Sequence, residues 1–224
     1  MKKPTIGLSL EGLPFIGLTA LLALVFALLE WPIPALIAFV LLFFVMNFFR
    51  DPERVTPQEK DVAVSPADGK VVKIETMRDP FTGKNRTTVC VFMNVFNVHV
   101  NRAPVSGTVD EIRYYPGKFF NASLDKASTD NERNAVKIMD GDGKSWTVVQ
   151  IAGLIARRIV CWTESGDKLL RGDRFGLIKF GSRLDLYLPG GYEPAVRIGD
   201  IVFAGQTLLA TKKHDESHYP GNIF

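Results

Sequence analysis

The chain has 224 residues, of which 46% are hydrophobic, and a formal net charge of +3 at pH 7. This length suffices for one domain with a hydrophobic core and an accessory segment. The small positive charge, with no dense run of lysine and arginine and no zinc-binding spacing, argues against a nucleic-acid partner. Cys90 and Cys161 form neither a disulfide framework nor a metal motif.

Two apolar runs lie near the N-terminus, at residues 13–29 and 35–49, and each contains a single polar side chain. Both runs are somewhat shorter than the ~20 residues that cross a bilayer. The segment "EWPIP" between them contains two prolines, which fit a tight connection between helices. A helix of a soluble core normally carries a polar stripe. Residues 1–49 are therefore predicted to form a membrane-anchoring helical hairpin.

Positive charges lie on both sides of this hairpin. Lys2 and Lys3 precede it, and Arg50 and Arg54 follow it. The positive-inside rule places both of its ends on the cytoplasmic side of the cell membrane. No small-residue cleavage site follows the first apolar run, so a cleaved signal peptide is not expected. The polar, proline-containing residues 50–61 are predicted to be a linker.

Residues 62–210 are predicted to form one mainly β body, a β-rich α+β fold of antiparallel sheets. Turn-forming glycine, proline and aspartate separate runs with strand character, whereas helical periodicity is scarce. The expected strands are residues 70–76, 87–96, 108–114, 134–139, 145–151, 158–162, 177–188 and 201–210. The polar residues 211–224 are predicted to be a loose tail.

Three phrases resemble the hammerhead hairpins of biotinyl and lipoyl carrier domains: "SPADGKVVKI", "APVSGTVDEI" and "VRIGDIVFAGQTLLA". A carrier also requires a lysine at the tip of a hairpin. The tripeptide "DKA", which contains Lys126, matches the lipoyl signature. Lys126 lies, however, in a long polar loop without closely flanking strands. A membrane-tethered carrier domain is therefore kept only as an alternative from another functional class.

Three polar residues interrupt these β contexts. Asp68 lies in "SPADGK", where an ordinary turn aspartate is the simplest explanation. His99 lies in an apolar strand, where a hydrogen-bonded core histidine is common. Ser182 takes an apolar position of the strand expected over 177–188, directly after Gly181, which indicates a bulge or a close approach to the backbone. Together, an aspartate, a histidine and a serine match an orienting group, a base and a nucleophile.

The environment of the serine favours self-cleavage over hydrolysis of another substrate. Ser182 lacks the G-x-S-x-G elbow of a hydrolase and lies within a strand. Its most accessible carbonyl is that of Gly181, and attack there, with the proton taken by His99, converts the amide into an ester. Elimination then releases the upstream chain, and hydrolysis leaves a pyruvoyl group at residue 182. Such a ketone can form a Schiff base with a substrate amine and accept the electrons left by departing carbon dioxide.

From the hydrophobic hairpin to about Ala210, the chain resembles the short, single-body type of phosphatidylserine decarboxylase proenzyme. The matching phrases are "SPADGKV", "FMNVFNVHVNRAPVSG", "YYPGKFFNASLDKAS", "NERN", "QIAGLIARRIV", "GDRFGLIKFGSRLDLYLP" and "GDIVFAGQTLLA". The resemblance implies that Asp68, His99 and Ser182 form the self-processing triad. It also implies cleavage between Gly181 and Ser182, a heterodimer of fragments 1–181 and 182–224, and a covalent pyruvoyl cofactor derived from Ser182.

The chain departs from the longer members of this family at two positions. Those members carry "GST" at the cleavage site, where this chain has "GSR". They also carry a further histidine three residues before the processing one, where this chain has Phe96. A second histidine that protonates the substrate is therefore not expected here, and this role falls to His99 or to water.

The resemblance implies a lyase that converts phosphatidylserine in the membrane to phosphatidylethanolamine and carbon dioxide. Arg133, Arg157 and Arg158 are candidates for contact with the lipid phosphate, although a solvated or salt-bridged strand end explains each equally well. Pyruvoyl-dependent decarboxylation of a related lipid or of a soluble amino acid is the alternative within the same class. No metal site is expected, and the sequence leaves a higher oligomer open.

Overall fold

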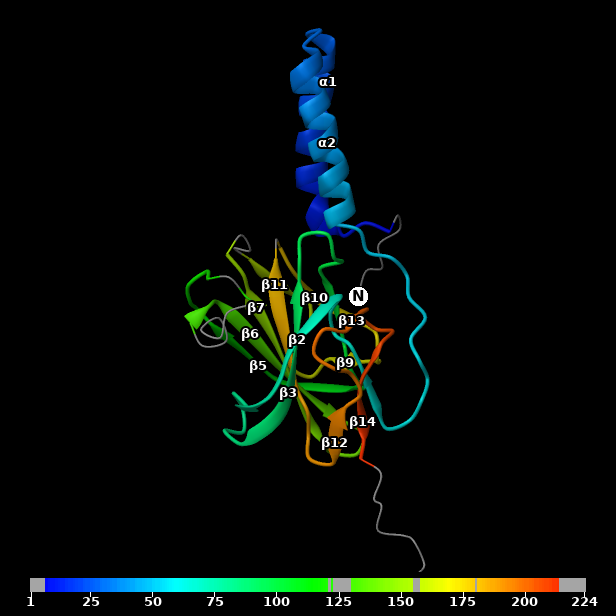
Figure 1. Ribbon diagram of the computed structural model, residues 1–224, viewed down its shortest axis with the longest axis vertical. Helices are drawn as coiled ribbons and strands as arrows, with labels where there is room; N and C mark the ends of the chain where they lie inside the picture. Colours follow the sequence, from blue (N-terminus) through cyan, green and yellow to red (C-terminus); the bar gives the residue numbers. More distant parts are fainter. Residues whose placement is uncertain (1–6, 121, 123–129, 155–157, 180, 214–224) are drawn as a thin grey trace, which may run out of the picture.

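A pair of N-terminal helices projects from a body of β-strands (Figure 1). The computed structural model describes residues 7–120, 122, 130–154, 158–179 and 181–213. The 3-10 turn η1 (Leu10–Gly12) leads into α1 (Leu13–Leu28), and α2 (Pro32–Phe48) returns alongside it toward the body. The predicted helical hairpin is confirmed.

The hairpin follows from its apolar composition and its prolines. Each helix has a proline within its first two positions, where the missing N–H removes no intrahelical hydrogen bond. Glu30 makes the turn in the left-handed region, with φ 57°. Apolar side chains are exposed on both helices, including Leu28 at 75% and Phe43 at 74%. The stretch Leu10–Leu28 is long and apolar enough to cross a membrane, which indicates membrane association.

The described strands of the body form three antiparallel sheets, so the predicted mainly β fold is confirmed. The largest sheet has eight strands, in the spatial order β13 (Ile201–Val202), β2 (Gly69–Arg78), β3 (Asn85–Met93), β11 (Ser182–Tyr187), β7 (Ser145–Ala152), β6 (Arg133–Asp140), β5 (Gly107–Tyr115) and β9 (Lys168–Leu169). One three-stranded sheet has the order β4 (Val100–Arg102), β10 (Arg174–Ile178), β8 (Ile159–Cys161). The other has the order β1 (Val62–Val64), β14 (Leu208–Lys212), β12 (Tyr192–Pro194).

β11 lies inside the large sheet, between β3 and β7, and all six of its residues are buried. Leu184 and Leu186 belong to the main hydrophobic core. Because side chains alternate along a strand, Ser182 lies on the same face as these leucines. Its register partners are Met93 on β3 and Ala152 on β7. The strand therefore begins with a buried hydroxyl on its core side.

The single strand expected over 177–188 is wrong, because the chain changes sheets within it. Residues up to Ile178 belong to β10, and residues from Ser182 belong to β11 in the eight-stranded sheet. Gly181 has φ 73°, in the left-handed region that glycine adopts without steric cost. The strand expected over 201–210 is likewise divided into β13 and β14, with a turn between them.

The segment after α2 is fastened to the body by a buried cluster of charges. The carboxylate of Asp51 is 2% exposed and accepts hydrogen bonds from Arg174 Nε at 2.8 and 2.7 Å. Arg102 Nη2 lies 3.4 Å from the same carboxylate. Arg174 and Arg102 come from β10 and β4, so this cluster joins the foot of the hairpin to the strand that leads to Ser182.

Replacing Asp51 with alanine is expected to destabilise the fold strongly, because it removes the buried carboxylate shared by Arg102 and Arg174 and leaves Arg174 only the more exposed Glu53 among its described ion-pair partners. Breaking a buried pair in this way costs on the order of 3–5 kcal/mol, or roughly 10 °C in the unfolding midpoint. Circular dichroism of the full chain in detergent during heating measures this loss. Glu75→Ala removes the exposed partner of Lys73 and serves as the control, with a change of about 1 kcal/mol or less. Equal midpoints for the two variants would contradict the structural role of Asp51.

Candidate active site

His99 contacts the backbone of Gly181 directly before β11 begins, and it packs against Phe48 at the foot of the hairpin. The backbone N–H of Gly181 donates to His99 Nε2 at 3.3 Å. His99 Nδ1 lies 2.9 Å from the carbonyl oxygen of Asn97. Because a carbonyl oxygen can only accept, Nδ1 carries the proton and Nε2 keeps its lone pair. The histidine thus presents its basic nitrogen to the backbone directly before Ser182.

The surroundings of His99 keep the imidazole neutral. The side chain is fully buried, and its ring centroid lies 4.3 Å from that of Phe48 on α2. Burial lowers the pKa of His99 to about 4, and the positive charge of Arg50 acts in the same direction. The hydrogen bond to Asn97 and the negative charge of Asp68 raise the pKa and offset part of this effect. At neutral pH the group is therefore a base rather than an acid.

Among the described residues, the hydroxyl of Ser182 has one weak partner. Its Oγ lies 3.9 Å from the sulfur of Met93, across the β3–β11 pair. Sulfur is a weak acceptor, so this contact holds the hydroxyl loosely. Within the described part of the chain, no hydrogen bond joins Ser182 to His99. Ser182 thus directly follows the residue that contacts His99, but its hydroxyl is turned toward Met93.

Asp68 is buried in the turn directly before β2, and both of its carboxylate oxygens accept hydrogen bonds. Its oxygens accept from Arg54 Nη1 at 2.6 Å and Nη2 at 2.8 Å, and from the N–H of Ala204 at 2.8 Å. Among the described residues, none of its hydrogen bonds goes to His99. It acts on His99 through its charge alone. The structure therefore brings His99 to the Gly181–Ser182 bond and holds Asp68 against Arg54.

Gly153, which follows β7, lies close against the carbonyl of Gly181. A Cβ atom on Gly153 would lie 2.4 Å from the carbonyl oxygen of Gly181 and 3.1 Å from its carbonyl carbon. Only a residue without a side chain permits this approach. The sequence analysis did not single out Gly153, although it lies in the phrase "QIAGLIARRIV". Strand periodicity carries no signal for a contact between two loop glycines.

A buried chain of amides extends behind Met93. Asn101 Nδ2 contacts the sulfur of Met93 at 3.8 Å, and Asn101 Oδ1 accepts from Gln150 Nε2 at 2.8 Å. Gln150 Oε1 in turn accepts from Asn134 Nδ2 at 3.0 Å. Paired buried amides rigidify their surroundings. This chain fixes the residue against which the Ser182 hydroxyl rests. Sequence reasoning missed it, because Asn101 lies on β4 of one sheet and the other two residues lie on β7 and β6 of another, so only the packing of the two sheets brings them together.

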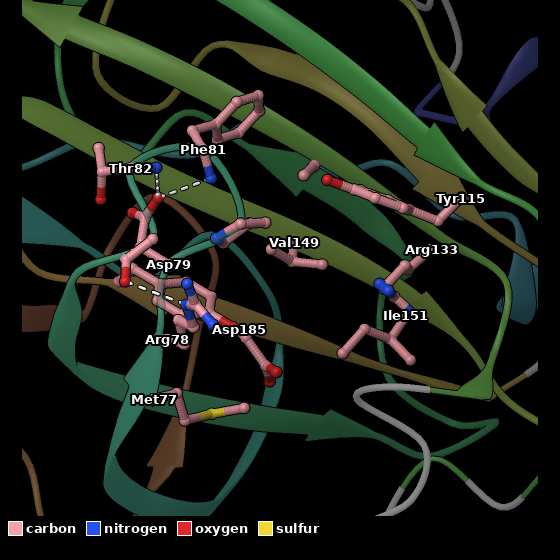
Figure 2. Close-up of a pocket in the computed structure, with 14 residues that line it drawn as sticks. Met77, Arg78, Asp79, Phe81, Thr82, Tyr115, Arg133, Val149, Ile151 and Asp185 are labelled. Carbon is pink, nitrogen blue, oxygen red and sulfur yellow. Dashed lines mark hydrogen bonds between the residues drawn. The ribbon is translucent and has the colours of Figure 1, made fainter.

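The residue after Ser182 lies on the opposite face of the sheet. Arg183 is fully buried, and its Nε and Nη2 donate to the two oxygens of Asp185, each at 2.8 Å. This bidentate pair accounts for the arginine of the "GSR" phrase. Asp185 also lines a cavity of about 600 Å³ on this face, together with Tyr187, Phe81 and Tyr115 (Figure 2).

The three arginines predicted to contact phosphate have different surroundings. Arg133 lines the cavity of Figure 2 and lies over the ring of Tyr115 at 4.5 Å. It is in register with Ile151, as is Arg183, so it lies on the face away from Ser182. Arg158 is exposed, and its carbonyl accepts from the N–H of Lys179. Arg157 lies outside the described residues, as does Lys126 of the carrier alternative.

Comparison with known proteins identifies the family. A profile of the phosphatidylserine decarboxylase family matches residues 41–210. The chain belongs to the phosphatidylserine decarboxylase family. It is 63% identical to a phosphatidylserine decarboxylase proenzyme of Solidesulfovibrio magneticus over 212 aligned residues. These residues are 95% of this chain and 99% of the relative.

Other members of the phosphatidylserine decarboxylase family are similar over nearly the whole chain. The proenzyme of Oleidesulfovibrio alaskensis is 62% identical over 213 residues, which are 95% of this chain and 98% of the relative. That of Burkholderia vietnamiensis is 49% identical over 205 residues, which are 89% and 94% of the two chains. The family resemblance of the sequence motifs is thereby confirmed, and the family makes the chain a carboxy-lyase.

The protonation of His99 is directly testable. We expect the imidazole to remain neutral down to about pH 4, because burial penalises the charged form. Nitrogen-detected NMR of the histidine side chains follows this titration, and comparison with His99→Gln assigns the signal. An unfolded chain binds the proton near pH 6.5. The free energy of unfolding should therefore fall by about 3 kcal/mol as the pH drops from 6.5 to 4. A His99 titration near pH 6.5 would contradict the buried neutral base.

Proposed function

We propose that this chain is a self-cleaving, membrane-bound decarboxylase that converts phosphatidylserine to phosphatidylethanolamine and carbon dioxide. One observation carries the proposal: the neutral Nε2 of His99 contacts the backbone of Gly181, directly before a buried serine. Membership of the phosphatidylserine decarboxylase family supports the reaction and its substrate. The word proenzyme in the names of the relatives supports processing of the chain.

In the first step, His99 Nε2 takes the proton of the Ser182 hydroxyl as this group turns away from Met93. Oγ bonds to the carbonyl carbon of Gly181, the carbon–nitrogen bond breaks, and the proton passes to the freed amine. The product is an ester isomer of the original amide, so no co-reactant is needed. Gly181 tolerates the change because it lies in the left-handed region, which a residue without a Cβ adopts without steric cost.

In the second step, residue 182 loses its α proton, its Cβ–O bond breaks, and Gly181 leaves as a carboxylate. Water then hydrolyses the resulting dehydroalanine, and ammonia departs. The products are fragment 1–181 and fragment 182–224, which begins with a pyruvoyl group. Because β11 is paired on both sides with strands of the larger fragment, β3 and β7, the two fragments are expected to stay together as a heterodimer.

The surroundings of residue 182 suit a pyruvoyl group. The position is fully buried, and Gly153 leaves the adjacent backbone the space that a Cβ would fill. When formed, the ketone supplies an acceptor for the electrons that a departing carboxylate leaves behind. His99 holds a lone pair beside this position and excludes water through its contact with Phe48. The charge of Asp68 adjusts the basicity of His99 without a direct contact.

The hairpin is proposed to hold this site at the cytoplasmic face of the cell membrane. Basic residues at both ends of the hairpin favour that orientation. Of the arginines considered for the lipid phosphate, Arg158 has the most suitable position, since it is exposed and hydrogen-bonded to Lys179, two residues before Gly181. Arg133 and Arg157 remain further candidates.

Replacement of Ser182 by alanine tests the nucleophile. The Ser182→Ala chain should remain full length and inactive, because no hydroxyl is present to attack Gly181. Ser165→Ala removes an exposed hydroxyl and should process like the parent. His99→Ala should process slowly or not at all. Intact mass spectrometry measures whether the chain is cleaved, and release of carbon dioxide from phosphatidylserine measures its activity. Cleavage of Ser182→Ala at this bond would refute the assignment.

The same mass measurement separates the carrier alternative. A lipoyl or biotinyl carrier would remain one chain and gain mass on Lys126. A self-cleaving enzyme instead gives two fragments with a blocked amino terminus at residue 182.

Gly153→Ala tests the placement of the carbonyl. Its Cβ would meet the oxygen of Gly181 at 2.4 Å, so the bond to be cleaved must shift. We expect processing to slow by about 10²-fold, the loss typical of a displacement of about 1 Å at a reacting group. Pulse labelling followed by gel electrophoresis measures the rate. Gly141→Ala is the matched control, since a Cβ there meets nothing within 4 Å. Equal processing of the two variants would rule out this role for Gly153.

A further inference from the structure

Two large apolar side chains are exposed where the hairpin joins the body. Phe96 is 65% exposed in the turn between β3 and β4, and Leu154 is 63% exposed directly after Gly153. The ring of Phe96 packs edge-on against Phe44 of α2, with 6.3 Å between centroids. In Figure 1 the turn before β4 and the end of β7 lie at the end of the body from which the hairpin projects. The apolar surface of the hairpin thus continues onto the body.

α2 is shorter than the hydrocarbon core of a bilayer, which indicates that lipid covers the apolar surface at its junction with the body. Its 17 residues extend about 25 Å along the helix axis, whereas the hydrocarbon core of a bilayer is about 30 Å thick. At the far end of the hairpin, Glu30 and Trp31 form the turn. A charge and an amphipathic aromatic residue place this turn at the far interface. The shortfall of about 5 Å therefore falls at the end next to the body.

The charges at this end of the body suit the layer of lipid head groups. Arg50 follows α2, and its Nη2 donates to the carbonyl of Phe96 at 2.7 Å. Glu11 lies at the foot of α1 and is paired with Lys179 at 3.0 Å, which neutralises its charge. A cation directly below an apolar rim is the arrangement that an interface with lipid phosphates favours.

We propose that Phe96 and Leu154 form a membrane rim that inserts into the bilayer and completes the apolar thickness that α2 lacks. Insertion of this rim lowers the body until the Gly181–Ser182 junction, which Gly153 contacts, lies within the head-group layer. A lipid head group then lies beside this junction while its acyl chains remain in the bilayer. The part of this inference that concerns the substrate rests on the proposed function, whereas insertion of the rim does not.

Fluorescence quenching by brominated lipids tests insertion without any enzymatic readout. The full chain carrying Phe96→Trp is placed in vesicles of phosphatidylcholine with brominated acyl chains, and the emission of the parent chain is subtracted. Leu170→Trp is the matched control. Leu170 is 69% exposed and follows Leu169, which pairs with Gly107 at the end of the strands away from Ser182. We expect strong quenching at position 96 and little at position 170. Equal quenching at the two positions would overturn the proposal.

Activity on two physical forms of the substrate tests the consequence of insertion. Leu154→Asp should lower the turnover of phosphatidylserine in vesicles by about tenfold or more, the equivalent of one lost apolar insertion. Turnover of a short-chain phosphatidylserine dissolved as monomers should change by less than about twofold, since no membrane is involved. Leu170→Asp should alter neither. Equal losses of Leu154→Asp on both substrates would overturn the role of the rim. A parent chain that is inactive on both forms of phosphatidylserine would instead refute the proposed function. The quenching experiment would then still show whether the rim inserts into the bilayer.

Discussion

The arrangement on which the site depends is the crossing of the chain from one sheet to another at Gly181. At this crossing the N–H of Gly181 donates to His99 rather than to a neighbouring strand, and its carbonyl lies against the Cα of Gly153. The N–H and the carbonyl of Gly181, which belong to the peptide bonds on its two sides, are thereby both contacted by residues far away in the sequence. A continuous strand would have placed these groups in an ordinary β ladder, where they would be paired with backbone.

Burial gives His99 its chemical character, and the hairpin supplies part of that burial. Phe48 and Phe49 at the end of α2 are fully buried, in a cluster with Val98, Val100 and Leu177 of the body. The foot of the hairpin is therefore a wall of the site as well as an attachment to the membrane. Removing it would expose His99 to water and raise the pKa of its imidazole toward the ordinary value.

Ion pairs stabilise the junction between the hairpin and the body, and one of them engages the carboxylate of Asp68. Asp51 fastens the chain after α2 to β4 and β10, and Arg54 continues the connection through its bidentate pair with Asp68. Asp68, which was expected to orient His99, is thus paired with Arg54 of the linker instead. Its influence on His99 is electrostatic and acts over a longer distance than a hydrogen bond. The linker and Asp68 are thereby joined to each other and to the strands beneath the hairpin.

By itself, the sequence determined the features that depend on local composition. Unbroken apolar runs predicted the hairpin, alternation predicted most of the long strands, and the motifs predicted the family. The same alternation placed Ser182 on the core face with Leu184, since the period of two depends only on neighbouring residues.

Tertiary structure alone decided which distant groups meet. The approach of Gly153 to Gly181 and the position of Arg133 on the face away from Ser182 depend on how strands are ordered in the sheet, and the pairing of Asp68 with Arg54 depends on how the linker packs against the body. Strand order is set by long-range burial and hydrogen bonding, which leave no periodic trace in the sequence. For the same reason the break at Gly181 was not predicted, because a glycine within an alternating run is compatible with both a continuous strand and a change of sheet.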